Sequence, residues 1–145
     1  MTADETHMTR ALELARQQFG RTGVNPSVGC VILNAGGQVI AEAATGDGGR
    51  PHAEQTALHR LAPEAAKGGT AYVTLEPCRE RSTGEAACSQ RLVAAGLARV
   101  VVATLDPHPQ GTGGLARLAA AGIAIETGLM KPAADALYAD FFASL

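Results

Sequence analysis

The sequence predicts an α/β protein in which helices are layered on a mixed sheet. Short apolar segments rich in β-branched residues alternate with segments of helical period along most of the chain. The first two of these strands are joined by a short turn, which gives one antiparallel hairpin ahead of the alternating part. With 145 residues, 46% of them hydrophobic, we expect one domain over residues 1–145 with a full core.

The strands are expected to begin with a nearly continuous apolar run, Val28 to Leu33, as is typical of a strand buried on both faces. The following Asn-Ala-Gly-Gly stretch has the composition of a hairpin turn. The five predicted strands cover residues 28–33, 38–44, 70–75, 99–104 and 123–125.

The helices are predicted from apolar side chains at helical spacing and from the glycines that follow them. The five predicted helices cover residues 6–19, 53–66, 86–95, 115–121 and 132–142. The strand–helix junctions at 46–54, 75–88 and 104–114 should gather at one end of the sheet. Ligands of open α/β sheets bind beyond the carboxyl ends of the strands, so we expect the functional site there.

The composition excludes several classes of function. Twelve basic and fourteen acidic residues give a net charge of −2, and with 3% aromatic residues and no Trp this disfavours a broad nucleic-acid surface. No apolar run approaches the roughly 20 residues of a membrane span, and the start of the chain lacks a secretory pattern. We therefore expect a cytoplasmic protein, in which three cysteines indicate metal or thiol chemistry more than disulfides.

A zinc site with a proton shuttle is the central functional prediction. His52 lies where a Gly-rich segment gives way to a helix, Cys78 follows a strand and a proline, and Cys88 begins the next helix. One imidazole and two thiolates leave a fourth tetrahedral position open for water, whose pKa zinc lowers toward neutrality. Glu54, two residues after His52, is then the carboxylate available to carry protons.

The joint pattern carries this prediction, because a single His, Glu or Cys at any of these places would usually be structural. An H-x-E motif followed by P-C and a further Cys is the signature of zinc deaminases, although nine residues separate Cys78 from Cys88 where the usual spacing is two. Cys30 lies inside an apolar strand and is expected only to pack there. For Glu76 we favour a structural role.

Charged residues near the two cysteines are candidates for binding a substrate. Arg79 and Arg81 lie between the proposed ligands, and either could hold an anionic group, although a solvated loop is the simpler interpretation. Asp106 and His108 follow a strand between prolines, where a rigid turn and a pocket wall are equally compatible with the sequence.

With these residues in view, the chain resembles the cytidine deaminase superfamily, and most closely the deaminase domain of the riboflavin-biosynthesis deaminase/reductases. The resemblance rests on residues 25–32 (Asn-Pro-Ser-Val-Gly-Cys-Val-Ile), 51–54 (Pro-His-Ala-Glu) and 71–78 (Ala-Tyr-Val-Thr-Leu-Glu-Pro-Cys), and it continues through 99–103, 106–107, 121–123 and 128–129. It implies a three-layer α/β/α fold with a mixed five-stranded sheet.

The same resemblance implies zinc bound by His52, Cys78 and Cys88, with Glu54 as proton shuttle. It also implies a diaminohydroxyphosphoribosylaminopyrimidine as substrate, bound through Asn25 and Asp106. No nucleic acid or membrane partner is expected, and the superfamily suggests a homo-oligomer. We expect the deaminase domain alone, without a reductase domain.

This sequence departs from the family pattern beside the site. Residues 79–87 lack the His and the Pro pair that usually follow the first Cys, and His108 stands where the family has Asn. The substrate could therefore be another amino-heterocycle, such as a nucleoside, a free base or a pterin-like compound. Two further alternatives are a deaminase acting on a flipped RNA base, which the charge disfavours, and a protein in which zinc is only structural.

Overall fold

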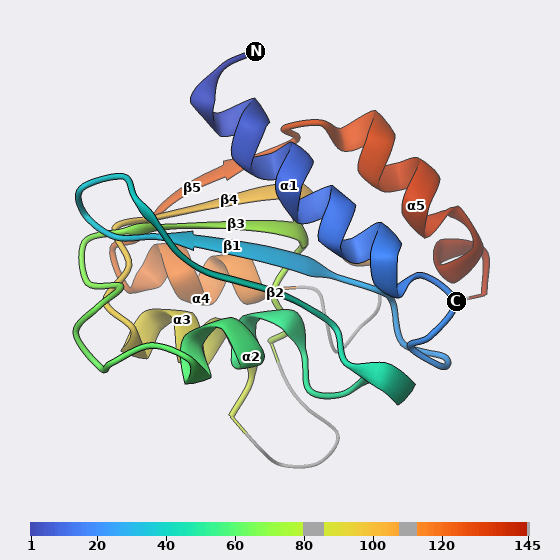
Figure 1. Ribbon diagram of the computed structural model, residues 1–145, viewed down its shortest axis with the longest axis horizontal. Coiled ribbons are helices and arrows are strands. Elements are labelled where there is room, and N and C mark those ends of the chain that lie inside the picture. The colour runs from blue at the N-terminus through green and yellow to red at the C-terminus, as the bar shows by residue number, and fades with distance from the viewer. Residues whose placement is uncertain (80–85, 108–112, 145) are drawn as a thin grey trace.

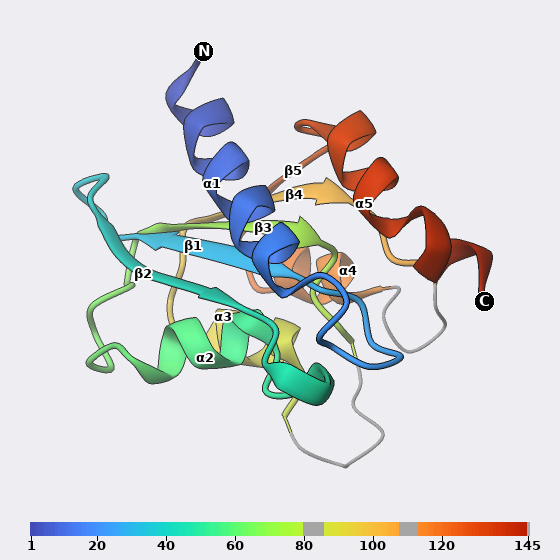
Figure 2. The ribbon, with the colours of Figure 1, turned by 45° about the vertical axis from the view of Figure 1, so that its right-hand side comes forward.

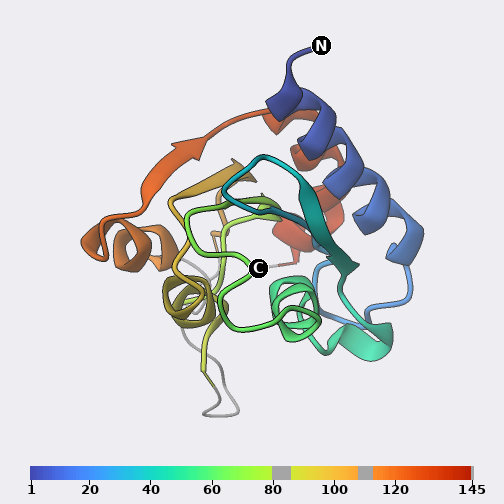
Figure 3. The same ribbon diagram turned by 60° about the vertical axis from the view of Figure 1, so that its left-hand side comes forward.

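The computed structural model describes residues 1–79, 86–107 and 113–144. Within them, a five-stranded sheet of order β2-β1-β3-β4-β5 lies between two layers of helices, α1 and α5 on one face and α2, α3 and α4 on the other (Figure 1, Figure 3). The strands are β1 (Gly29–Leu33), β2 (Val39–Ala44), β3 (Thr70–Leu75), β4 (Arg99–Thr104) and β5 (Ala124–Thr127). The helices are α1 (Ala3–Gln18), α2 (Ala53–His59), α3 (Cys88–Ala94), α4 (Gly114–Ala120) and α5 (Lys131–Ala143), with a short 3-10 turn, η1 (Asp47–Gly49), before α2. The predicted fold class is confirmed.

The sheet is mixed, as the opening hairpin predicts. Strand β1 pairs antiparallel with both β2 and β3, whereas β3, β4 and β5 are parallel. In β4, Val100 and Val102 pack toward α2, α3 and α4, while Val101 and Ala103 pack toward α1 and α5. Both faces of the central strands are therefore covered by apolar side chains, and the carboxyl ends of the parallel strands β3 and β4 lie at the edge of the sheet where the candidate site is found.

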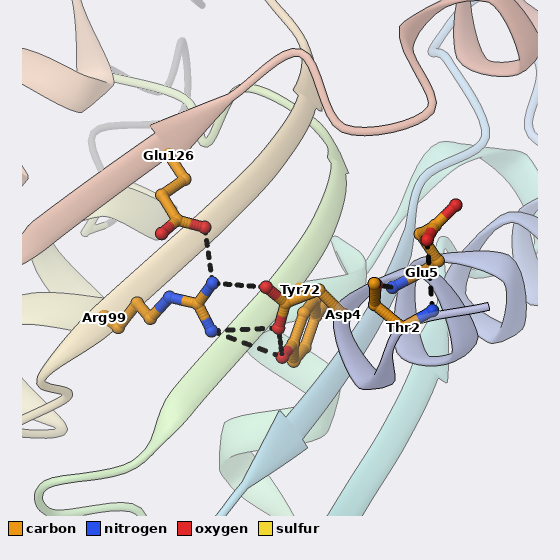
Figure 4. A network of polar contacts seen from close by, with 6 residues as sticks. All are labelled: Thr2, Asp4, Glu5, Tyr72, Arg99 and Glu126. Carbon is orange, nitrogen blue, oxygen red and sulfur yellow. Dashed lines mark hydrogen bonds and ion pairs between the residues drawn. The ribbon is translucent and has the colours of Figure 1, made fainter.

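Helix α1 begins earlier than predicted because of a capping box. The Thr2 hydroxyl accepts from the Glu5 amide at 3.1 Å, and the Glu5 carboxylate accepts from the Thr2 amide at 3.0 Å (Figure 4). These contacts satisfy amide groups that the first turn otherwise leaves unpaired. The helix therefore starts at Ala3 instead of Thr6.

The predicted helix over residues 53–66 is wrong in its second half. Helix α2 ends at His59, and residues 63–68 form turns instead. Pro63 has no amide hydrogen to donate and disfavours helical geometry at Ala62, so the helical apolar pattern cannot continue through it. The bounds of the other predicted helices and strands differ from the structure only at their ends.

The amino end of α1 is tied to the sheet by the Asp4–Arg99 cluster, which consists of Asp4, Tyr72, Arg99 and Glu126 (Figure 4). The Asp4 carboxylate accepts from Arg99 Nη2 at 2.6 Å and from the Tyr72 hydroxyl at 2.5 Å, and Arg99 also pairs with Glu126. Hydrogen bonds from Arg99 and Tyr72 lower the pKa of Asp4 from its ordinary 3.8 to about 2. The cluster thus joins α1 to β3, β4 and β5.

Asp4→Asn is expected to remove a pH-dependent part of the stability. Because the pKa of Asp4 is lower in the folded chain, its contribution is fully present above pH 3.8 and is lost as the pH falls toward about 2. The Asp4 side chain is 33% exposed, so after allowance for solvent screening we expect about 1 kcal/mol at neutral pH. Urea unfolding of both proteins over a pH series measures the difference at each pH. A difference that stays constant down to the acid end would contradict this role of Asp4.

Candidate active site

The proposed zinc ligands meet beyond the carboxyl end of β3. His52 immediately precedes α2, Cys78 follows the end of β3, and Cys88 is the first residue of α3. Helices α2 and α3 run side by side on the same face of the sheet, so their amino ends are close together (Figure 2). The fold therefore converts a spacing of 26 residues between His52 and Cys78 into a direct contact.

The three side chains present their donor atoms to one another. His52 Nδ1 lies 3.4 Å from Cys88 Sγ and 3.9 Å from Cys78 Sγ, and all three donor atoms are within 4.8 Å of one another. A tetrahedral zinc with the usual bond lengths places its sulfur and nitrogen ligands about 3.5 Å apart. The arrangement thus has the donor types and the spacing of a zinc site.

Local hydrogen bonds favour the thiolate form of Cys78. Hydrogen bonding to the Cys88 side chain, with further contributions from His52 and the Cys88 amide, lowers the pKa of Cys78 to about 4. The Cys88 amide lies 3.2 Å from Cys78 Sγ, and the Ser89 amide donates to the Cys78 carbonyl. The first turn of α3 therefore fixes Cys78 and prepares it as a ligand, because the thiolate is the form that binds metal.

Glu54 is buried beside this donor set. It lies in the first turn of α2 and is 4% exposed. Burial is the largest influence on its carboxyl group, and together with the charge of Cys78 it raises the pKa of Glu54 to about 7 against the opposing effect of His52. A carboxyl group that gains and loses a proton near neutral pH suits general acid–base chemistry.

Residues 1–104 match the family described as the cytidine and deoxycytidylate deaminase zinc-binding region. The chain belongs to this deaminase family. Riboflavin biosynthesis protein RibD of Escherichia coli K12 is 48% identical over 95% of this chain, which spans 37% of that relative's length. The diaminohydroxyphosphoribosylamino-pyrimidine deaminase of Buchnera aphidicola from Acyrthosiphon pisum is 39% identical over 96% of this chain, and 93% of its own length is covered.

Solved structures of related proteins share the fold of this chain. Acinetobacter baumannii RibD superimposes with a TM-score of 0.89 at 39% identity, over 98% of this chain and 39% of that one. The deaminase/reductase of Thermotoga maritima superimposes with a TM-score of 0.89 at 33% identity, over 97% of this chain and 40% of that one. The cofactor of this family is zinc, and the His and Cys donors of the present chain fit that ion by type and distance.

Glu76 binds three backbone amides near the ends of β4 and α4, which confirms the structural role expected for it. Its two carboxylate oxygens accept from the amides of Asp106, Gly113 and Leu115 at 3.1–3.4 Å. A Cβ on Gly114 would lie 1.8 Å from the Pro77 carbonyl oxygen, so α4 packs directly on the backbone before Cys78. Glu76 therefore joins the ends of β3 and β4 to the start of α4.

Glu76→Gln is expected to lower the free energy of unfolding by about 2 kcal/mol, because a buried amide that donates would replace an oxygen that accepts. Urea unfolding measures the loss. Zinc content should stay unchanged, since the Glu76 carboxylate accepts from backbone amides of Asp106, Gly113 and Leu115 and not from the metal donors. Unaltered stability of the variant would refute this role. Glu13→Gln, at an exposed position on α1, serves as the matched control.

Of the five candidate substrate-binding residues, three lie within the described part of the chain. Asn25 is half-buried and donates from Nδ2 to the Gly49 carbonyl at 3.2 Å, and Asp106 lies just past β4 with its amide on Glu76. Arg79 directly follows Cys78 and is exposed. Arg81 and His108 lie outside the described residues. The structure thus brings Asp106 and Arg79 to the same end of the sheet as Cys78, in agreement with the predicted gathering of junctions.

Arg117 of α4, which no sequence signal indicates, donates from Nη1 to the Arg79 carbonyl at 2.8 Å and to Ser89 Oγ at 3.1 Å, and so links the segment after Cys78 to α3. Cys30 is fully buried in β1 with a pKa raised by burial, and it is not among the three donors that the described residues bring together. Its packing is as expected.

Proposed function

We propose that this chain catalyses the hydrolytic deamination of an amino-pyrimidine, with His52, Cys78 and Cys88 as zinc ligands and Glu54 as proton shuttle. One observation carries the proposal: a buried carboxyl group with a pKa of about 7 lies beside a His-Cys-Cys donor set. A purely structural zinc site would not require such a group. Four protein ligands are usual in structural sites, whereas three with an open position are usual in catalytic ones.

The chemistry follows from the positions of these side chains. When bound, zinc supplies a Lewis acid that lowers the pKa of the attacking water. Glu54 takes a proton from that water while the water oxygen bonds to the ring carbon that bears the amino group. Glu54 then returns this proton to a ring nitrogen, takes the remaining proton from the added hydroxyl and delivers it to the amino group, which leaves as ammonia. The ring gains one oxygen and loses one amine, so no other reactant is needed.

The substrate that we propose is the diaminohydroxyphosphoribosylaminopyrimidine of riboflavin biosynthesis. It is supported by the Buchnera relative, which bears the name of that deaminase and is nearly fully covered by this chain. In this proposal Asn25, Asp106 and His108 hold the heterocycle, and Arg79 and Arg81 hold its phosphate. Guanidinium groups suit phosphate because they pair with two oxygens at once.

The test is ammonia release from this pyrimidine phosphate by protein whose zinc content has been measured. Release that depends on Glu54 supports the proposal. A panel of cytidine, deoxycytidylate, guanine and pterins serves as the comparison. Release from a panel member alone would retain the chemistry and replace the substrate, and no release from any compound by zinc-loaded protein would refute the function.

We further propose a cytoplasmic homo-oligomer. Three free cysteines, two of them in the candidate metal site, suit a reducing compartment. Among the described residues, no helix has both the length and the apolar character needed to cross a membrane. Light scattering coupled to size-exclusion chromatography measures the oligomer directly, and a monomer at working concentration would refute that part.

A further inference from the structure

A series of buried hydrogen bonds joins α5 to β3 and to the start of β1, on the face of the sheet that α1 and α5 cover. The Tyr138 hydroxyl of α5 lies 2.7 Å from the Ser27 carbonyl and 2.6 Å from the Thr74 hydroxyl of β3, which in turn lies 3.0 Å from the Gly29 amide. The directions of donation are fixed, because a carbonyl only accepts and an amide only donates. Gly29 therefore donates to Thr74, Thr74 donates to Tyr138, and Tyr138 donates to Ser27.

These hydrogen bonds hold the segment that leads from Asn25 into β1. Both ends of the series are backbone groups of that segment, at Ser27 and at Gly29. The Ser27 hydroxyl donates to the Ala15 carbonyl of α1 at 2.6 Å. A Cβ on Gly29 would lie 1.8 Å from the Ala11 carbonyl oxygen, so α1 rests directly on the segment. The backbone after Asn25 is thus fixed from α1, β3 and α5 together.

Charged groups of the candidate site also affect the pKa of the Tyr138 hydroxyl. Burial raises the pKa of Tyr138 most, and the carboxylates of Glu54 and Asp106 raise it further. Thr74 lies in β3, the strand that leads through Glu76 to Cys78. Tyr138 therefore connects the Asn25 segment with the strand that delivers a proposed zinc ligand.

We propose that Tyr138 is a positioning residue, which acts through Thr74 and the Ser27 carbonyl to hold Asn25 where it binds the substrate. The inference rests on the proposed function, in which Asn25 contacts the heterocycle. Tyr138 itself contacts neither substrate nor zinc in this scheme. Its hydroxyl should therefore affect substrate binding much more than the chemical step.

Tyr138→Phe tests this, with Tyr72→Phe as the matched control. Each tyrosine is 2% exposed and each hydroxyl has two partners, but those of Tyr72 are Asp4 and Arg99. Both variants should lose stability to urea. Only Tyr138→Phe should raise KM, by about tenfold, with kcat within about twofold and zinc content unchanged, because one lost buried hydrogen bond is enough for such a change. Equal KM values in the two variants would overturn the proposal.

Thr74 provides a second pair of variants that does not depend on Tyr138→Phe folding. Thr74→Ser keeps the hydroxyl and should keep KM near that of the unaltered protein. Thr74→Val removes the hydroxyl at nearly constant shape and should raise KM as Tyr138→Phe does. Combining Thr74→Val with Tyr138→Phe should raise KM little further, because both substitutions break the same series of hydrogen bonds. Equal KM for Thr74→Ser and Thr74→Val would refute the role.

A readout without substrate separates this inference from the proposed function. The side-chain amide of Asn25 gives a pair of NMR signals that should shift or broaden in Tyr138→Phe and stay in place in Tyr72→Phe. Unchanged Asn25 signals in Tyr138→Phe would overturn the positioning role even if the unaltered protein is an active deaminase. The unaltered protein could fail to deaminate while Tyr138→Phe still shows the expected NMR change. That result would refute the proposed function but support the structural link between Tyr138 and Asn25.

Discussion

Glu54→Gln is expected to lower kcat by about 10³-fold while the zinc content stays at that of the unaltered protein. Gln keeps the shape of the side chain but can neither accept a proton from water nor deliver one to the ring, and positioned acid–base groups are usually worth 10²- to 10⁴-fold. Glu54 is not one of the three donors, so metal binding should persist. Steady-state ammonia release and metal analysis of the same sample measure both quantities.

Glu64→Gln is the control for this experiment. Glu64 lies beyond α2 and is exposed, and its ion pair with Lys67 is 4.0 Å long at the surface. It should leave kcat and zinc content unchanged. Normal ammonia release by Glu54→Gln would end the assignment of Glu54 as proton shuttle. Loss of zinc by that variant would mean that Glu54 is a ligand.

Cys88→Ala is expected to reduce zinc from about one ion per chain to almost none, since an imidazole and one thiolate alone make a poor tetrahedral site. Activity should disappear with the metal. The stabilisation that added zinc gives the unaltered protein, about 4 kcal/mol at a free concentration 1,000 times the Kd, should also disappear. Metal analysis and thermal unfolding with and without zinc measure these losses.

Cys30→Ala is the matched control, because Cys30 and Cys88 are both buried cysteines on the same side of the sheet. It should lose some packing energy in the core but keep zinc and activity. Full zinc occupancy in Cys88→Ala, or loss of zinc in Cys30→Ala, would require a different ligand set.

The sequence was sufficient to predict the layers and the sheet because its signals there are local. The buried strands β1, β3 and β4 are runs of mostly apolar residues, and α1, α3 and α4 are each followed two residues later by a glycine. The end of α2 was predicted wrongly because the apolar pattern through Ala66 outweighed Pro63, whose missing amide hydrogen decides the outcome. The H-x-E and P-C motifs placed the donors because they lie at element ends that the fold brings together.

The remaining features of the site depend on contacts between distant residues. Nothing local to Tyr138 distinguishes it from any other aromatic residue on the buried face of a helix, and its partners are 64 and 111 residues away. Arg117 is likewise an ordinary helix residue until α4 is placed beside the segment after Cys78. Such roles can be recognised only once the three-dimensional structure shows which residues are in contact.

The way in which Cys78 and Cys88 are held has a consequence for how this scaffold can diversify. Each sulfur is placed by a regular element, Cys78 by the end of β3 and Cys88 by the start of α3, and the two are joined by contacts from the α3 amides to Cys78. The number of residues inserted between them is therefore uncoupled from the metal geometry. That interval is a natural site for insertions, because its length can change while the candidate metal site keeps its geometry.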